Sequence, residues 1–179
     1  MYALVSLIVL LASAPPTDDA IEARVRTRAA AIASALPQGR APTEVAVAAA
    51  IDDLLELPRF GKGSLPQSWT TLTQPEQVRF LGVFRKMLIR QFTRPLIDDH
   101  DVRISVLGRT RVGAELRVRM RIEGRRHSRE VEWVFPDGAN GRASDSIVDD
   151  TRQSSTYSRS LERSFRRGGL DAVIAKMSR

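Results

Sequence analysis

The chain of 179 residues is 42% hydrophobic and 27% charged, a balance typical of one globular domain and unlike that of a disordered chain. It contains no cysteine, which excludes disulfide bonds, thiolate nucleophiles and sulfur-ligated metals. Lys and Arg outnumber Asp and Glu by 28 to 21, and this net charge of +7 favours an anionic partner without selecting its class.

The chain begins with an uncharged apolar run, ALVSLIVLLASA, over residues 3–14. The run is too short for a membrane-spanning helix, which needs about 20 residues. Its length suits the apolar core of a secretory signal peptide, and Ala12-Ser13-Ala14 has the small-x-small form of a cleavage site. No Lys or Arg precedes the run and two prolines follow it, so a buried N-terminal helix is the alternative. We expect residues 1–16 to be a signal peptide for export and residues 17–179 to form a single domain.

Helical spacing of apolar residues predicts two helices after this segment, over residues 17–36 and 42–58, the second ended by Pro58. The stretch RFGKGSLPQSW that follows is predicted to be a loop that can include a single turn of helix. Its GKGS lacks the upstream glycine and the four-residue spacer of a phosphate-binding loop, so we interpret it as a turn.

The clearest helix begins at Thr73, which is predicted to be its N-cap. Pro75 lies in the first turn and Glu76 completes a capping box. The apolar stripe of this helix consists of Phe80, Phe84, Leu88 and Phe92. Such a stripe is usually part of a hydrophobic core.

The period changes to two after Pro95. The stretch VGAELRVRMRIEG, residues 112–124, alternates apolar and charged side chains, which predicts a strand with one face buried and one in water. Shorter strands are predicted at residues 102–106, 131–135 and 142–148, and a helix broken at Gly168-Gly169 ends the chain. The predicted class is α+β, with an antiparallel sheet of about four strands and helices packed on one face.

No catalytic or metal site is evident. His100 and His127 are isolated, and the run Asp98–Asp101 is typical of a solvated turn. Arginines on the 112–124 strand are interrupted by glutamates, and the aromatic residues lie on the opposite face, so we expect no nucleic-acid binding. Two alternatives stay open: a small cone-shaped α+β enzyme with an Asp or His in its cavity, and an interaction module without a cavity.

Two segments resemble the MlaC or toluene-tolerance family, which comprises periplasmic phospholipid-binding partners of an ABC transport system. The first is LPQSWTTLTQPEQVRFLGVFRKML, residues 65–88, with the family's leucine, tryptophan, Leu-Thr, Glu-Gln and paired phenylalanines. The second is TYSRSLERSFRRGGLDAVIAKM, residues 156–177, with its tyrosine-bearing helix and Gly-Gly-Leu-Asp. The likeness extends over about residues 51–177.

The chain departs from the family pattern around the last strand. Ala143 stands near the usual tryptophan, Asp149-Asp150-Thr151-Arg152 replaces Glu-Gly-Val-Ser, and Ser158 replaces an arginine after the helix tyrosine. A divergent member with altered cargo or partner contacts would show this pattern.

The resemblance implies an apolar cavity between sheet and helices that holds phospholipid acyl chains while the headgroup stays in solvent. Phospholipid would be cargo, and we expect no cofactor or metal. The residues that we predict to line this cavity are Phe80, Phe84, Leu88, Phe92, Leu116, Val118, Met120, Ile122, Val131, Trp133 and Phe135. Near its mouth we place Arg103, Arg109, Arg111 and Arg152.

The resemblance also implies where the protein works and with what. The localisation would be the periplasm, and the partners would be an inner-membrane ABC transporter complex with a hexameric lipid-binding ring and an outer-membrane lipoprotein complex. Lipid would be shuttled between them by a monomer that contacts membrane surfaces transiently, without covalent chemistry.

Overall fold

The structure is a computed structural model that describes residues 15–99, 101–125, 127–137 and 140–179. The predicted signal peptide falls almost entirely on residues 1–14, outside the described residues. The helices are α1 (Asp18–Ala35), α2 (Arg40–Leu54), α3 (Leu57–Ser64), α4 (Gln74–Ile97) and α5 (Gln153–Met177), with short 3₁₀ turns at Leu36–Gln38 and Trp69–Thr71. The strands are β1 (Arg103–Val112), β2 (Glu115–Glu123), β3 (Ser128–Pro136), β4 (Asp145–Val148) and β5 (Thr151–Arg152).

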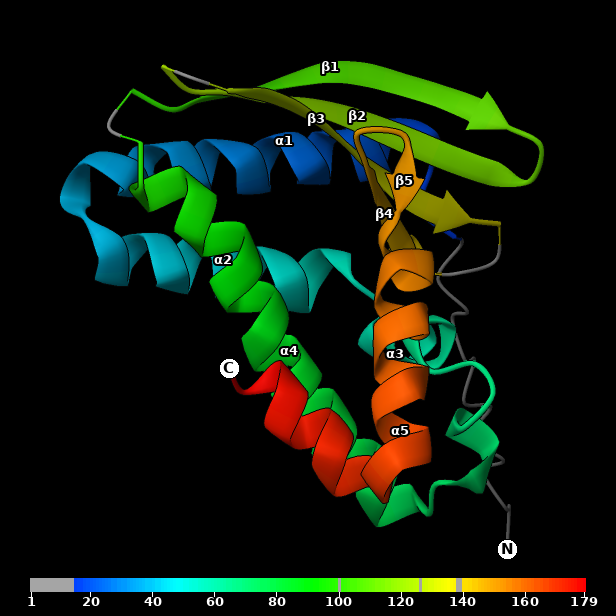
Figure 1. Cartoon of the computed structure of the whole chain (residues 1–179). Helices are drawn as coiled ribbons and strands as arrows, with labels where there is room; N and C mark the ends of the chain where they lie inside the picture. Colours follow the sequence, from blue (N-terminus) through cyan, green and yellow to red (C-terminus); the bar gives the residue numbers. More distant parts are fainter. Residues whose placement is uncertain (1–14, 100, 126, 138–139) are drawn as a thin grey trace, which may run out of the picture.

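The predicted α+β class is confirmed. The five strands lie in the order β1-β2-β3-β4-β5, with every neighbouring pair antiparallel, and the two-residue β5 accounts for the difference from the four expected strands. Helix α1 runs along one face of the sheet, and α2 and α4 lie on that same side (Figure 1). No helix of the described residues lies on the opposite face (Figure 1).

The last helix is kinked at Gly168 and Gly169, as predicted. Both residues leave helical geometry, and Gly169 adopts a φ of 62°, a conformation that favours glycine. The part of α5 after the kink turns back along α4 (Figure 1). The kink therefore places the C-terminal residues beside the middle of α4.

The prediction of a loop with a single turn of helix after Pro58 is wrong in the extent of the helix, because α3 occupies the eight residues Leu57–Ser64. Helix α2 ends at Leu54 instead, and Pro58 lies in the first turn of α3, where its missing N–H is not needed. Gly61 has a packing role: a Cβ on it would lie 2.6 Å from Cδ2 of Leu81 on α4. Gly61 suggested a turn in the sequence, but in the structure it allows α3 and α4 to approach each other closely.

Helix α4 has the predicted capping box. The Glu76 side chain accepts hydrogen bonds of 2.8 Å from both the backbone N–H and the hydroxyl of Thr73. The helix continues through Pro95 to Ile97, one turn beyond the apolar stripe used to predict it. Only one intrahelical N–H is lost at Pro95, near the helix end, so the helix tolerates it.

The first strand is longer than predicted. It extends from Arg103 to Val112 and contains a bulge that disturbs its pattern of alternation. The register with β2 shifts between Val106 and Gly108, and Gly108 adopts a φ of 128°. The strand then resumes and reaches Val112. Alternation in the sequence is broken at the bulge, which explains why the strand seemed to end at Val106.

Candidate functional site: an apolar cavity beside a basic cleft

A small cavity lies between the helices and the sheet. Its volume is about 40 Å³. It is lined only by apolar residues, which come from α1, α2, α4 and strands β1 to β3: Ile32, Val47, Ala50, Ile51, Phe92, Leu96, Ile104, Met120, Ile122, Val131 and Trp133. Water fills cavities that offer polar partners, so a chamber with these walls suits hydrocarbon.

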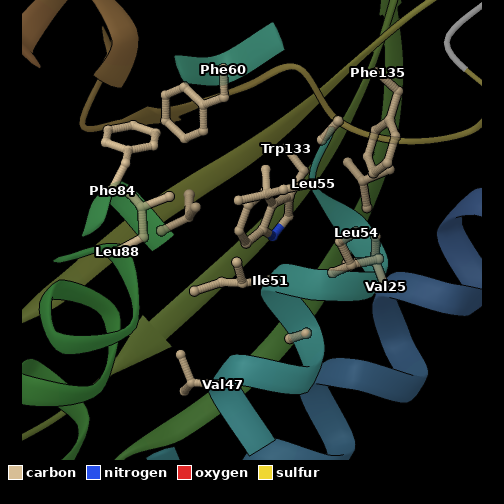
Figure 2. Packing of buried hydrophobic residues seen from close by; sticks show 14 of the residues in the cluster. Val25, Val47, Ile51, Leu54, Leu55, Phe60, Phe84, Leu88, Trp133 and Phe135 are labelled. Carbon is tan, nitrogen blue, oxygen red and sulfur yellow. The ribbon is translucent and has the colours of Figure 1, made fainter. Parts of the chain in front are cut away.

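Five of the eleven side chains predicted to bind lipid border this cavity: Phe92, Met120, Ile122, Val131 and Trp133. The Phe92 ring of α4 meets the Trp133 indole of β3 with 5.7 Å between ring centroids. The Trp133 N–H has only a weak acceptor, the Met120 sulfur at 3.3 Å. Figure 2 shows the indole directed towards Ile51 of α2.

The other six predicted residues are buried away from the cavity: Phe80, Phe84, Leu88, Leu116, Val118 and Phe135. Phe84 is enclosed by other aromatic rings, with centroids 5.4 Å from Phe60 and Phe80 and 5.8 Å from Tyr157. Phe60 and Phe84 form a group of their own in Figure 2. The first half of α4 therefore packs on α3 and α5, and the second half faces the cavity.

A cleft of about 530 Å³ adjoins the cavity where α4 ends and β2 turns into β3. Ile122 lines both spaces, so the cleft and the apolar chamber are neighbours at this residue. The cleft also contains Arg94, Arg125 and Arg129. Asp98 and Asp99 line it as well, so the cleft carries charges of both signs, with arginine in excess.

Arg129 was missed by the sequence analysis, although the strand pattern contains it. It pairs with Ile122 across the β2–β3 ladder, and opposite residues of antiparallel strands project to the same side of the sheet. It therefore continues the inward-facing row of Phe135, Trp133 and Val131 by one more step of two residues. Extending the alternation of β3 towards its start would have found this arginine.

The arginines predicted near the mouth lie elsewhere or are held in ion pairs. Arg109 and Arg111 bind carboxylates of the first turns of α1, including Arg111 to Asp18 at 2.7 Å and Arg109 to Glu22 at 2.6 Å. Arg103 lies nearer the cleft, in a neighbouring pocket that also contains Arg125. On the outer face of the sheet, Arg117, Arg119 and Arg121 face glutamates at 2.7–3.8 Å, so this row of cations is neutralised.

Residues that depart from the family pattern build the junction between the sheet and α5. Ala143 is fully buried and exchanges backbone hydrogen bonds with Leu54 and Glu56 at 2.7 and 2.8 Å. Asp149 and Asp150 have φ values of 47° and 61° in the tight turn between β4 and β5. The hydroxyl of Ser158 donates to a backbone carbonyl within α5. Neither these residues nor Arg152 line the cavity.

Arg152 ties this junction to β2. Its guanidinium lies 2.6 Å from the Glu115 carboxylate and 3.6 Å from that of Asp145. Asp145 in turn accepts hydrogen bonds from the backbone N–H and hydroxyl of Ser154, in the first turn of α5. The hydrogen bond from Arg152 lowers the pKa of Glu115 from its usual value.

This pair should make stability depend on acid pH. Because the pKa of Glu115 is lower in the folded state, its stabilising effect is complete above the unfolded pKa of about 4.3 and is lost as the pH falls through the folded value. Arginine hydrogen bonds lower the pKa of Asp52 and Glu130 in the same way. The urea concentration at the unfolding midpoint should decrease as the pH is lowered below about 5. In the Glu115→Gln variant this decrease with pH should be smaller. Glu44→Gln is the control, since Glu44 has no ion pair with the described residues. If both variants change the pH dependence of the urea midpoint equally, the prediction is contradicted.

The described residues contain neither a metal-binding cluster nor a membrane-spanning helix. Among them, no group of His, Asp and Glu is arranged to hold a metal ion. None of the helices in the described ranges is both long and apolar enough to cross a bilayer.

Fold and site together define an α+β domain in which helices and one sheet face enclose a small apolar chamber beside a basic cleft. The MlaC protein family model matches residues 23–179, and the chain belongs to this family. Among solved structures, the chain is similar to a phospholipid-binding protein from Ralstonia solanacearum determined in complex with a phospholipid. The TM-score is 0.71 at 16% identity, over 88% of this chain and 94% of the other, which shows a shared fold. No curated protein matches the sequence.

Proposed function

We propose that this protein is a periplasmic carrier that encloses phospholipid acyl chains and moves them between an inner-membrane transporter complex and an outer-membrane lipoprotein complex. The observation that carries the proposal is the apolar chamber, which lies beside an arginine-lined cleft at Ile122. Family membership and the fold shared with a phospholipid-binding protein support it. Export by the predicted signal peptide supports the location.

Enclosure is a physical requirement for such a carrier. Moving an acyl chain of about fifteen methylenes from a membrane into water costs about 12 kcal/mol, at about 0.8 kcal/mol per methylene. A soluble carrier has to offset nearly all of that cost by burying the chain. An exposed patch leaves half of the chain surface in water, so a chamber is needed.

The chamber must widen to hold a complete chain. A volume of about 40 Å³ holds about three water-sized spheres, since each needs about 10–15 Å³. Helix α4 and the sheet meet across the chamber at the Phe92–Trp133 contact. We propose that this contact separates when lipid enters, so that the chain extends from the chamber into the adjoining cleft.

Trp133 offers a direct test. The chain has two tryptophans, and Trp69 packs on Phe80 away from the chamber. In a Trp69→Phe variant, phospholipid with brominated acyl chains should quench most of the remaining fluorescence, because bromine quenches at contact distance. In the matched Trp133→Phe variant, the emission of Trp69 should stay nearly constant.

A second measurement needs no added lipid. The purified protein should retain phospholipid through gel filtration, and mass spectrometry of an organic extract should identify it. A well-folded, lipid-free monomer in which brominated chains leave Trp133 unquenched would contradict the proposal.

The two alternatives find less support. A cavity enzyme needs a titratable group in its chamber, whereas the described residues around this one are all apolar. The buried carboxylate of Glu162 instead accepts hydrogen bonds from Gln67 and Ser68. An interaction module needs no chamber, and it is favoured if the walls stay closed in the bromine test.

A further inference from the structure

We propose that the basic cleft reads the phospholipid headgroup and selects anionic lipids over zwitterionic ones. This inference rests on the proposed function, because it requires acyl chains to occupy the apolar chamber. It adds a specificity that an apolar chamber alone does not provide.

The basic cleft comprises the 530 Å³ cleft at Ile122 and an adjoining hollow of about 790 Å³. Arg94 and Arg129 line both parts. The second part is bounded by the start of α2, the end of α4, the start of β3 and the end of α5. Its cations are Arg40, Arg90, Arg94, Arg129, Lys176 and Arg179, against the two carboxylates of Glu44 and Asp98.

Most of these cations have no acidic partner among the described residues. Arg94 pairs with Asp98 at 3.5 Å, and Arg90 donates to the backbone carbonyl of Met177. Arg40, Arg129 and Lys176 form no ion pair with any described residue. On the outer face of the sheet, by contrast, the arginines are matched by glutamates, so part of the net charge of +7 is concentrated in the basic cleft.

The position of Arg129 connects this charge to the acyl chain. Its side chain projects to the same side of the sheet as Ile122, Val131 and Trp133, one step beyond the apolar row. A lipid whose tail lies against that row has its phosphate beside the Arg129 guanidinium. Phosphate is the group that arginine binds through two parallel hydrogen bonds.

Charge balance then distinguishes the two kinds of lipid. Unpaired cations attract the phosphodiester of both, but they repel the quaternary ammonium of a choline headgroup. Phosphatidylglycerol has no such cation. Each exposed ion pair contributes little by itself. Several cations together should enrich the anionic lipid about tenfold, equivalent to about 1.4 kcal/mol.

Competition between two lipids with identical chains tests the inference. Lipid-free protein is incubated with equimolar dioleoyl phosphatidylglycerol and dioleoyl phosphatidylcholine, repurified, and its bound lipid is quantified by mass spectrometry. The wild type should be enriched about tenfold in the anionic lipid. Arg129→Gln should bring the ratio close to one, and Arg163→Gln, an exposed cation of α5 outside the cleft, should leave the ratio intact.

Four other outcomes would overturn the inference, and each points to a different explanation. Equal binding of the two lipids refutes headgroup selection and leaves the carrier function standing, whereas binding of neither refutes the carrier function. An unchanged ratio in Arg129→Gln means that the cleft serves another anion, such as an acidic protein surface. Inorganic phosphate added during loading should lower the ratio but not the total lipid; tight phosphate binding without any effect on the ratio would identify a free-phosphate site instead.

Discussion

Ala50→Leu should weaken phospholipid binding about 50-fold. Ala50 is buried on α2 and borders the apolar chamber. Leucine has three more carbon atoms, which occupy the space of about three methylenes of the acyl chain. At about 0.8 kcal/mol per methylene the loss is about 2.4 kcal/mol, which corresponds to the stated change in affinity. Quenching of Trp133 by brominated lipid in the Trp69→Phe background measures the dissociation constant.

The substitution also strains the fold, so a matched control is required. Inserting extra carbons into a packed interior costs about 1–3 kcal/mol of stability, and circular dichroism must show that the variant is folded at the assay temperature. Ala31→Leu makes the same chemical change on the exposed side of α1 and should leave the affinity unchanged. If the folded Ala50→Leu variant binds lipid as tightly as the wild type, the chamber is not the acyl-chain site.

Phe84→Ala should lower the free energy of unfolding by about 3–5 kcal/mol, the usual cost of emptying a buried aromatic site. Phe84 is completely buried, and its ring touches those of Phe60, Phe80 and Tyr157. These contacts join α3, α4 and α5, so their loss loosens the helical layer. Domains are stable by about 5–15 kcal/mol in total, which makes this a large fraction. Urea unfolding followed by circular dichroism gives the value.

Phe92→Ala on the same helix separates stability from binding. Phe92 is half-buried and touches Trp133 across the chamber, so its loss should cost less stability than the loss of Phe84. It should change the affinity for lipid, because it removes part of the chamber wall. Phe84→Ala should leave the affinity of the folded fraction unaltered. The reverse pattern would mean that lipid occupies the aromatic cluster of α3, α4 and α5 and that the chamber at Phe92 is ordinary core.

Local signals in the sequence identify most of the elements. The capping box at Thr73 and Glu76 predicts where α4 begins, the two-residue period predicts β2, and Gly168-Gly169 predicts the kink in α5. These features depend on a residue and its near neighbours, which is why single-sequence reasoning reaches them. The helix α3 was missed because Gly61 has a packing role that depends on Leu81, twenty positions further along the chain.

By itself, the sequence determined the α+β class, the family resemblance and the apolar faces of α4 and the strands. Only the tertiary structure decided which part of each face meets which neighbour. The Phe80 and Phe84 turns of α4 pack on other helices and the Phe92 turn faces the sheet, although all three share one helical stripe. Periodicity fixes the direction in which a side chain projects from its own element, but the crossing of two elements depends on contacts distant in sequence. For the same reason, the meeting of Arg129 with Ile122 and the end of α4 in one cleft appears only in three dimensions.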